Sequence, residues 1–559
     1  MSGRTDKESR RASLPVRLIP YAVSILFLIA CLIFGDVYYE TNDDSVLNLI
    51  AAGAYGEPVA PYMIFSNVCY GYLLNMLYSL IPGINWYFLI VIVLNALGAG
   101  IIADMLAGKT QSIAKALTVS FAVNLLLTED FYLSLQFTKN AAFCFLVGCL
   151  LLYKAWRNGS ISLIPCGTWY VLMGVMIRKE ACLPVMPFMM LCVAFSLRKT
   201  KRVKLLAAAL IPSVVLVSMV LIVHEAVYAA PEWAEYRETF AARYALYDGG
   251  GRAYYPEHGE DYARIGLSEN DVELMKSYVI MDTDSITADV WQEVGRIISM
   301  EQESGYRISL PLIKSMAGAA AETLAEKTLP KVFVILALAG VLLLTKKERI
   351  FVLLTILSIA ACYWYFACVN RFQWRVELIC YLAGSICMAV FLSERAACGH
   401  DLSRVFRWTA AVLTVASIAG LVFIRTAHIR RIESRPAGTS DTAQRFEELY
   451  AREDVFYLGN DFSVSSPLSR ITRTRYGGLY RRYCFLGGWT VPTPTGLYYA
   501  RQYGIDNPVR SLVTRDDVRL LANEDLAERI RVHLEEVTGK TVTKEERASG
   551  CWSFGTEGQ

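Results

Sequence analysis

Long apolar blocks are the feature that most restricts what this chain can fold into. Hydrophobic residues make up 54% of its 559 residues and charged residues only 19%, against about 25% charge in an average soluble protein. The apolar residues are concentrated in runs of about 18–22 residues, the length that an α-helix needs to cross a bilayer. This pattern excludes an ordinary soluble enzyme and a disordered chain, and a net charge of +3 is too small to indicate nucleic-acid binding.

About eleven of these blocks are predicted to cross the membrane. The first, 17–34, follows a basic N-terminus, is too long for a usual signal-peptide core and precedes no small-residue cleavage site, so we predict an uncleaved anchor with a cytoplasmic N-terminus. Residues 161–197 are interpreted as two short helices around Arg178-Lys179-Glu180. The remaining blocks are 86–106, 113–127, 137–156, 205–228, 332–344, 350–369, 376–392 and 408–424.

The block 62–81 is ambiguous because it contains Asn67, Asn75 and several tyrosines. Basic residues favour the cytoplasmic side of a membrane. If 62–81 does not cross, the basic clusters at 109–115, 154–157, 198–202, 346–349 and 395–407 all lie on that side; if it crosses, all of them move outside. We therefore predict that 62–81 is a re-entrant or interfacial pair of half-helices.

This topology gives an α-helical polytopic membrane protein with a small exported α/β domain. Its parts are a basic cytoplasmic N-terminus (1–17), an N-terminal transmembrane module (18–228), an extracytoplasmic insertion (229–330), a second transmembrane module (331–424) and an extracytoplasmic α/β domain (425–559). In the last part we predict strands at 455–458 and 518–521 and a helix over 524–538 that Asn523 caps. Cys484 and Cys551 are the only cysteines there, which leaves a disulfide open.

The acidic segment 40–44, just outside the first span, is the strongest chemical signal. Adjacent carboxylates repel each other, which raises the pKa of one of them. In the functional interpretation Asp43 or Asp44 is a general base that takes a proton from an acceptor hydroxyl, while the other orients that hydroxyl or binds a cation. In the structural interpretation Asp43 or Asp44 caps a helix over 45–54. The two interpretations are compatible.

Further candidate residues follow the same outer face. Glu129 and Asp130 open the second outer loop, and Lys139, a candidate substrate-binding residue, ends it. The acidic pair would hold an acceptor sugar or a divalent ion, or would be a solvated loop. Arg178 and Lys179 lie between two apolar runs. Either their ionisable side chains face a cavity, or the residues form an external turn between two short spans.

Two sets of residues complete the candidates. Arg371 and Arg375 are four apart, so their guanidinium groups would bind the phosphate of a lipid or extend to the headgroups without a specific role. In the insertion, Arg243, Tyr244, Asp248, Tyr254, Tyr255 and Tyr262 would bind carbohydrate rings or lie on a bilayer surface. The five histidines lack the spacing of a zinc site.

The order of these features resembles the GT-C superfamily of membrane glycosyltransferases, which use polyprenyl-phosphate-linked sugars. One span after a basic N-terminus leads to Asn42-Asp43-Asp44, then to an interfacial segment, a second acidic loop at Glu129-Asp130, many spans and an exported C-terminal domain. The segment Asn85-Trp86-Tyr87 and the Asn42-Asp43-Asp44 motif also resemble large polytopic membrane proteins of Gram-positive bacteria whose function is uncharacterised. The likeness is architectural, and adjacent aspartates replace the Asp-x-Asp or Glu-x-Asp pattern of many GT-C members.

The resemblance implies an inverting glycosyltransferase of the bacterial plasma membrane. Asp43 or Asp44 would be the base, Glu129 and Asp130 would contact the acceptor or a Mg²⁺ or Mn²⁺ ion, and Arg178, Lys179, Arg371 and Arg375 would hold the lipid phosphate. Its partners would be membrane lipids, a polyprenyl-phosphate-linked sugar and a glycan or protein acceptor, without nucleic acid. Two other classes stay open: a lipid or polysaccharide transporter, which paired inverted repeats would favour, and a non-catalytic envelope assembly protein.

Overall fold

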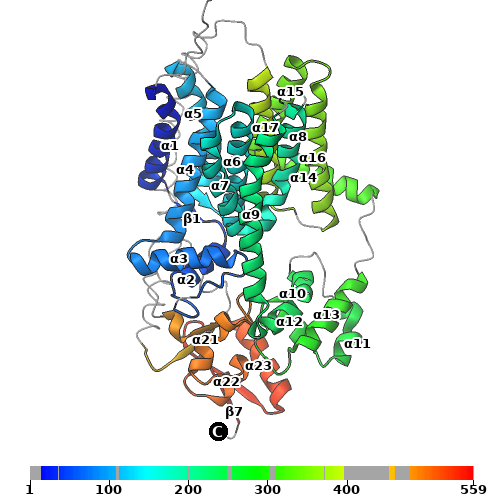
Figure 1. The fold of residues 1–559 in the computed structure, drawn as a ribbon. Coiled ribbons are helices and arrows are strands. Elements are labelled where there is room, and N and C mark those ends of the chain that lie inside the picture. Colours follow the sequence, from blue (N-terminus) through cyan, green and yellow to red (C-terminus); the bar gives the residue numbers. More distant parts are fainter. Residues whose placement is uncertain are drawn as a thin grey trace, which may run out of the picture.

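A bundle of long helices stands above a smaller sheet region in the computed structural model (Figure 1). The structure describes residues 14–395, 452–459 and 479–557, apart from gaps at 36, 59, 109–111, 198–199, 201, 248–254, 302–308 and 370–371. The predicted span 408–424 therefore lies outside the described residues.

Eight helices in the described part are long and apolar enough to cross a membrane, so the chain is a helical membrane protein. They agree with the predicted spans, with α7 and α8 counted as one continuous stretch over Ile161–Leu197. The predicted span 332–344 corresponds to α15 (Thr328–Leu343), which is apolar but shorter. The remaining candidate spans are α1 (Leu14–Phe34), α4 (Trp86–Ala107), α5 (Ile113–Leu127), α6 (Phe137–Asn158), α9 (Val203–Tyr228), α16 (Arg349–Cys368) and α17 (Trp374–Arg395).

The stretch Ile161–Leu197 turns back on itself, as predicted. Helix α7 (Ile164–Cys182) is followed by a 3-10 turn, η3 (Leu183–Val185), and by α8 (Met186–Leu197). Arg178 contacts Thr138 at the start of α6, whereas Ser196 is hydrogen-bonded to Tyr153 toward the other end of α6 at 2.8 Å. Gly148 permits α6 and α7 to pack closely, because a Cβ at this position would lie only 2.5 Å from the Val171 backbone nitrogen.

Two short helices, α2 (Asn42–Ala51) and α3 (Val68–Leu80), lie across the lower end of the bundle (Figure 1). Helix α3 is not among the candidate spans of the described residues. The predicted pair of half-helices at 62–81 is wrong, because the segment forms one helix preceded by an irregular stretch. The side chain of Asn67 caps α3 by accepting a hydrogen bond from the Cys69 N–H at 2.9 Å.

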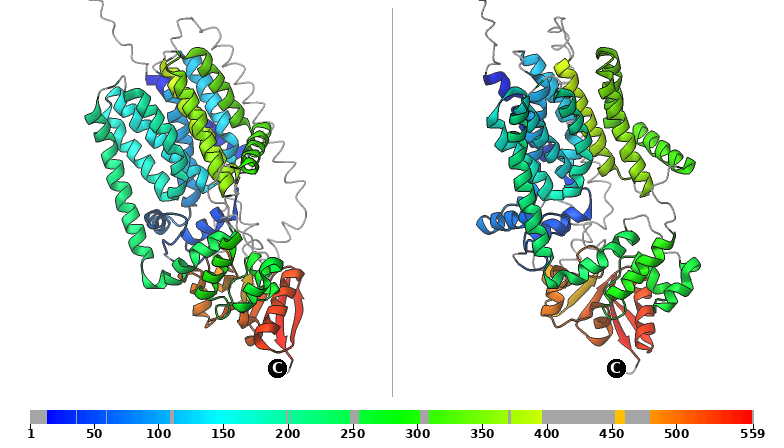
Figure 2. Two further views of the ribbon diagram at one scale, coloured as in Figure 1. Left: turned by 90° about the vertical axis from the view of Figure 1, so that its right-hand side faces the viewer. Right: turned by 45° about the vertical axis from the view of Figure 1, so that its right-hand side comes forward.

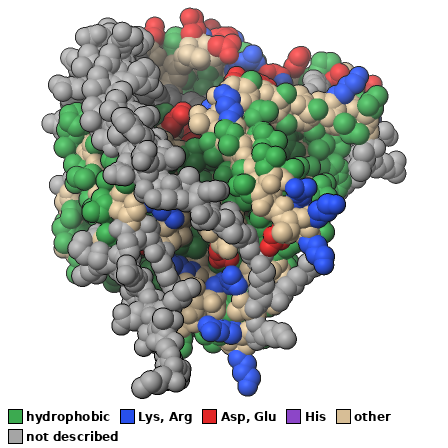
Figure 3. Space-filling model, turned by 90° about the horizontal axis from the view of Figure 1, so that it is seen from above, with side chains coloured by type: hydrophobic (Ala, Val, Ile, Leu, Met, Phe, Trp, Pro, Cys, Tyr) green, Lys and Arg blue, Asp and Glu red, His purple; other side chains and the backbone are tan. Residues whose placement is uncertain are grey.

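Basic residues of several connections between the spans lie at the upper end of the bundle. Lys154 pairs with Asp104 at 2.7 Å and Arg157 with Glu394 at 3.1 Å, which brings the ends of α4, α6 and α17 together at the upper end. Figure 3 looks onto this end and shows basic side chains around it, with acidic ones between them. The described basic residues of this end include Arg17, Lys115, Lys154, Arg157, Arg202, Lys204, Lys346, Lys347 and Arg349.

The C-terminal part forms a mixed sheet of five strands in the order β4-β3-β5-β7-β6. Strands β3 (Phe456–Gly459), β4 (Tyr483–Phe485) and β5 (Val518–Leu521) are parallel, and β6 (Val542–Ala548) and β7 (Cys551–Thr556) complete the sheet as antiparallel neighbours. Helices α21 (Pro494–Gln502), α22 (Pro508–Thr514) and α23 (Glu524–Thr538) accompany it. The predicted strands at 455–458 and 518–521 and the helix with its Asn523 cap are confirmed.

The sequence did not decide whether Cys484 and Cys551 form a disulfide, and in the structure they do not. Both are buried free thiols. Cys484 is on β4 and Cys551 on β7, with β3 and β5 between them. Three strand spacings separate the two residues by about 14 Å, too far for an S–S bond.

The predicted short helices of the insertion pack against this sheet rather than forming a separate domain (Figure 2). The Ile280 N–H donates to the Leu486 carbonyl at 2.8 Å, and Gly487 permits the approach because a Cβ there would lie 1.5 Å from the Tyr278 carbonyl oxygen. We call these insertion helices and the sheet the lower unit. The helices are η4 (Pro231–Trp233), α10 (Ala234–Tyr247), α11 (Tyr255–Arg264), α12 (Glu269–Lys276) and α13 (Ala288–Glu301), while α14 (Leu310–Glu326) packs beside the bundle, near α16.

Candidate functional site

A short parallel strand pair brings the two acidic loops together. Strand β1 (Tyr38–Tyr39) pairs with β2 (Ser134–Leu135), and the Glu40 N–H donates to the Leu135 carbonyl at 2.8 Å. The segment before β2, Thr128–Leu133, is a π-helical turn, η1, a form that is frequent at functional sites. As a result, the segments 40–44 and 129–139 meet at the first turn of α6.

Asp44 lies at the centre of this meeting point and is only 1% exposed. Its Oδ1 accepts hydrogen bonds from the Tyr87 hydroxyl at 2.9 Å and from the Phe137 N–H at 3.0 Å, and its Oδ2 accepts one from the Thr41 hydroxyl at 3.3 Å. Burial raises the pKa of the Asp44 carboxyl to about 8 against the opposing effect of these hydrogen bonds. At neutral pH the carboxyl is therefore largely protonated and is a poor general base.

The prediction that Asp43 or Asp44 caps a helix over 45–54 is wrong. Helix α2 begins at Asn42, so Asp43 and Asp44 are in its first turn, and the N-cap is Thr41. Asp44 instead caps α6, by accepting from the first amide of that helix. Gln136 accepts from the next two amides, those of Thr138 and Lys139. Asp43 is half-buried and thus more accessible than Asp44.

Lys139 is a buried cation between the two acidic loops, and its side chain is 0% exposed. Its Nζ lies 2.5 Å from Glu40 Oε2 and 3.0 Å from Asp130 Oδ1. The indole N–H of Trp374, at the start of α17, also donates to Asp130 Oδ1 at 3.1 Å. Three segments that are distant in the sequence therefore share one charge-paired cluster.

Arg178 lies beside the same turn of α6. One of its Nη atoms donates to the Thr138 hydroxyl at 2.9 Å. Its guanidinium lies over the Phe137 ring at 4.6 Å and the Phe65 ring at 5.4 Å, a cation–π arrangement. Helix α7 is interrupted at this residue, where the backbone is extended. The break allows the Arg178 side chain to reach the start of α6.

The other predicted site residues are not brought into this cluster by any contact that the structure gives. Lys179 pairs with Glu225 on α9 at 3.2 Å, and both side chains are largely exposed. Glu129 is exposed on η1. Arg375 is half-buried next to Trp374. Arg371 lies outside the described residues.

Asp44 and Asp130 do not fit a shared divalent ion. The oxygens of Asp44 accept hydrogen bonds from three groups, and Asp130 Oδ1 accepts from Lys139 and Trp374. Lys139 provides the positive charge that joins Glu40 to Asp130, where a bridging ion would otherwise be needed. The predicted use of these carboxylates as ligands for Mg²⁺ or Mn²⁺ therefore has no support in the geometry.

The lower unit packs against the irregular loop that leads to α3. Tyr55 contacts Phe485 with ring centroids 5.0 Å apart, and its hydroxyl donates to the Gly496 carbonyl at 3.3 Å. Phe65 contacts Trp489 at 4.8 Å. Because Phe65 also lies next to Arg178, the lower unit adjoins the candidate site.

Sequence reasoning misses the roles of Glu40, Tyr87 and Trp374. Each is the partner of a predicted residue: Glu40 of Lys139, Tyr87 of Asp44, and Trp374 of Asp130. Glu40 is the first residue of the acidic segment, and Trp374 directly precedes Arg375. Their closeness in the sequence to predicted site residues was a weak indication that they belong to the site. Nothing in the sequence around Tyr87 indicates that it contacts a carboxyl group.

The predicted tyrosine-rich surface of the insertion is only partly a surface. Tyr262 is 1% exposed and belongs to the core formed by α10–α13. Arg243 is also buried, Tyr255 is half-buried and Tyr244 is exposed. Asp248 and Tyr254 lie outside the described residues.

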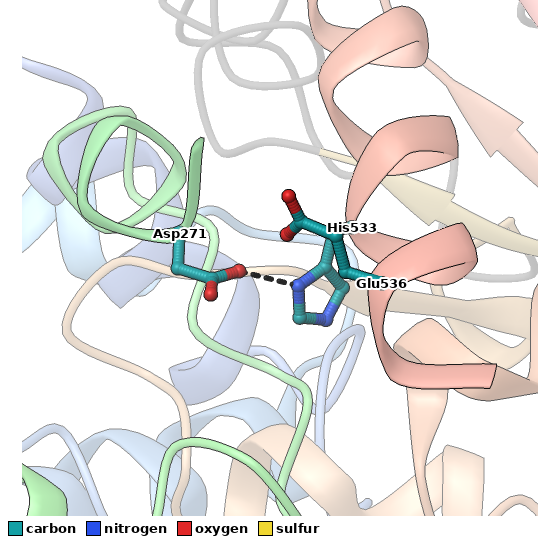
Figure 4. Close-up of side chains that lie close together, drawn as sticks. All are labelled: Asp271, His533 and Glu536. Carbon is teal, nitrogen blue, oxygen red and sulfur yellow. Dashed lines mark hydrogen bonds and ion pairs between the residues drawn. The ribbon is translucent and has the colours of Figure 1, made fainter. Parts of the chain in front are cut away.

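A second ionisable cluster joins the insertion to the C-terminal sheet region. His533, on α23, is 3% exposed; its Nδ1 lies 2.6 Å from Asp271 and its Nε2 2.9 Å from Asp282. Figure 4 shows the Asp271 carboxyl group facing the imidazole across the space between α12 and α23, with Glu536 on α23 nearby. Arg510 also contacts Asp282, at 3.1 Å.

The hydrogen bonds of His533 indicate an imidazolium rather than a metal ligand. Burial lowers the pKa of His533, but its hydrogen bonds to Asp271 and Asp282 outweigh burial and raise this pKa to about 9. Asp271, His533 and Glu536 are close enough to hold a metal ion. However, an imidazolium that donates from both ring nitrogens has no lone pair for a metal.

No protein-family model matches this chain, and no curated protein is similar to it. The fold defines the chain as a helical membrane protein with a C-terminal sheet region, and its function has to be inferred from the site.

Proposed function

We propose that this protein is a membrane glycosyltransferase of the GT-C type, which moves a sugar from a polyprenyl-phosphate donor to a cell-envelope acceptor. One observation carries the proposal: the acidic motif of the first outer loop, Asp130, Lys139 and Arg178 meet around the first turn of α6. Separate segments of the chain contribute these groups. Such a convergence of acidic and basic side chains at one end of a membrane bundle suits an anionic lipid substrate and an acceptor hydroxyl.

In this proposal Asp43 is the general base and Asp44 is a positioning residue. Asp44 is enclosed and largely protonated at neutral pH, whereas Asp43 is half-buried on the same helical turn. Asp43 takes the proton of the acceptor hydroxyl while the acceptor oxygen forms a bond to the anomeric carbon of the sugar. The bond from that carbon to the phosphate oxygen breaks, and polyprenyl phosphate leaves with the electron pair. Attack opposite the leaving group inverts the anomeric configuration.

Arg178 is the residue that we assign to the leaving phosphate. Its guanidinium is half-buried, uses one Nη for Thr138 and is oriented by two aromatic rings. A fixed guanidinium stabilises the charge that develops on phosphate oxygens as the bond to the sugar breaks. Arg375, at the start of α17, is a second candidate for this role.

We infer that the site end of the bundle faces away from the cytoplasm. The opposite end carries the basic residues of the described connections, which favour the cytoplasmic side. The site end carries Glu40, Asp43, Glu129 and Asp130 beside its basic residues Lys139, Arg178 and Lys179. A donor in the outer leaflet would then reach Arg178 laterally, between helices.

The test is the release of polyprenyl phosphate by the purified full-length protein in detergent. Radiolabelled polyprenyl-phosphate glucose and polyprenyl-phosphate mannose serve as probes, together with a cell-envelope extract as acceptor. Loss of a general base lowers a rate by about 10²–10⁴, so Asp43→Asn should lose at least a hundredfold. Arg178→Gln should also be strongly impaired.

Two neighbouring residues are matched controls. Lys179→Gln and Glu129→Gln remove charges at the same end of the bundle, outside the contacts of the cluster, and should stay within about twofold of the wild-type rate. An Asp43→Asn protein with the wild-type rate would refute the proposal. Movement of the intact donor across vesicles, without cleavage, would indicate a transporter instead.

A further inference from the structure

Arg243, on α10, is a buried cation that forms no ion pair at contact distance with the described residues. It is 6% exposed. One Nη donates to the Gly488 carbonyl, and the guanidinium lies 5.9 Å from the centre of the Tyr236 ring. Its other Nη is buried and has no hydrogen-bond partner. Neither a backbone carbonyl nor an aromatic ring neutralises the charge.

This arrangement is unfavourable for a protein whose only task here is to fold. A buried charge is normally paired, and a buried N–H without an acceptor loses the hydrogen bond that it makes in water. Such a group in a native structure calls for an explanation, of which an absent ligand is one.

A second donor without a hydrogen-bond partner belongs to the residue that follows Gly488 in the chain. Gly488, which accepts from Arg243, directly precedes Trp489, and the indole N–H of Trp489 is also buried without a hydrogen-bond partner. The Trp489 ring contacts Phe65, which in turn lies next to Arg178. The two donors come from the insertion and from the C-terminal sheet region, and the Trp489 ring links this region to the candidate site through Phe65.

We propose that Arg243 and Trp489 form a phosphate subsite at the junction of the insertion, the C-terminal sheet region and the bundle. The guanidinium Nη and the indole N–H would each donate to one oxygen of a phosphate group, whose charge would neutralise Arg243. This inference deepens the proposed function, on which it rests only for the identity of the phosphate carrier.

The test uses the full-length protein in detergent and follows thermal unfolding by tryptophan fluorescence. The two probes are inorganic phosphate and mixed micelles that contain undecaprenyl phosphate. A ligand that binds only the folded state raises the melting temperature. We expect at least one probe to do so. Arg243→Met should lower the apparent affinity roughly tenfold or more, and Arg243→Lys should weaken it less.

The stability of the ligand-free variant separates the subsite from a structural role. Arg243→Met removes an unpaired buried charge, so without phosphate it should melt no lower than the wild type. Arg237, earlier on α10, is exposed and donates to the carbonyls of Tyr228 and Ala230. Arg237→Met should therefore respond to phosphate as the wild type does.

Each outcome decides the question. A response to inorganic phosphate identifies a site for free phosphate, and a response to the micelles alone identifies a lipid headgroup; both support the subsite. No response to either probe, an equal response in Arg243→Met, or a ligand-free Arg243→Met that melts well below the wild type would overturn it. An Arg243-dependent response in a protein without transferase activity would sink the proposed function but leave the subsite standing.

Discussion

The contact between the insertion and the C-terminal sheet region should weaken as the pH rises, because His533 holds it as an imidazolium. The pKa of His533 rises from 6.5 to about 9 on folding. The folded state therefore binds the proton more tightly, and the stabilisation is complete below about pH 6.5. It is lost as the pH rises through about 9. A difference of about 2.5 pKa units corresponds to stabilisation on the order of 3 kcal/mol.

His533→Gln removes this proton-linked stabilisation, and hydrogen exchange by mass spectrometry can locate the loss. Peptides of α12 and α23 from the variant and the wild type are compared at the same pH, so that intrinsic exchange rates cancel. At about pH 6 the variant should exchange up to roughly 100-fold faster. At about pH 9.5 the wild type has lost the proton, and the two proteins should converge.

His258→Gln is the matched control, because His258 lies on α11, away from α23 in the sequence, and pairs with Asp261 of its own helix at 3.4 Å. It should leave the exchange of α23 unchanged. If the gap between His533→Gln and the wild type were the same at both pH values, the imidazolium interpretation would be refuted. The pKa values of Asp271 and Asp282 are lowered mainly by their hydrogen bonds to His533 against the effect of burial. Their contribution is lost only below about pH 3.8.

Three further experiments test the bundle and the sheet. Lys139→Met leaves two carboxylates without their shared cation and should cost about 3 kcal/mol in detergent unfolding, whereas Lys139→Arg should recover part of it. Asp44→Asn keeps the acceptor for Tyr87 and removes the carboxyl group whose pKa is raised. Its stability should increase relative to that of the wild type as the pH rises from about 4 to about 8, because burial disfavours the charged form of the wild-type carboxyl group. Equal pH profiles of the two proteins would contradict this. Mass mapping should find Cys484 and Cys551 alkylated as free thiols.

Local patterns in the sequence were sufficient for the long apolar helices, for two strands of the C-terminal sheet and for helix α23. The apolar blocks gave the spans that the structure describes, and Asn523 gave the start of α23 because a cap acts on amides within the next turn. The two helices within 161–197 also followed from charges that interrupt apolar runs. These features depend on neighbouring residues only.

The partners of the site residues could not be predicted in the same way. Asp44 was expected to cap its own helix, but it caps α6, far along the chain, because β1 and β2 pair and bring the two loops together. Strand pairs of two residues carry almost no pattern in the sequence. Lys139 was expected to bind substrate, and no pattern in the chain indicated that Glu40 would neutralise it.

Phe65 is the residue through which the lower unit affects the candidate site, and its removal gives the last prediction. Its ring contacts Trp489 at 4.8 Å and Phe137 at 6.0 Å, and the Arg178 guanidinium lies 5.4 Å from its centre. Aromatic pairs contribute about 0.5–1.5 kcal/mol beyond burial and a cation–π contact about 0.5–2 kcal/mol. Phe65→Ala should therefore cost about 3 kcal/mol, most of it local.

The local effect should appear on both sides of Phe65. Exchange of backbone amides should accelerate in the 486–493 loop and also at the start of α6, while α23 should remain as protected as in the wild type. Phe65→Tyr keeps the ring and should behave like the wild type. If only the 486–493 loop responded, Phe65 would hold the lower unit without orienting Arg178. The lower unit would then be an attachment to the site rather than a part of it.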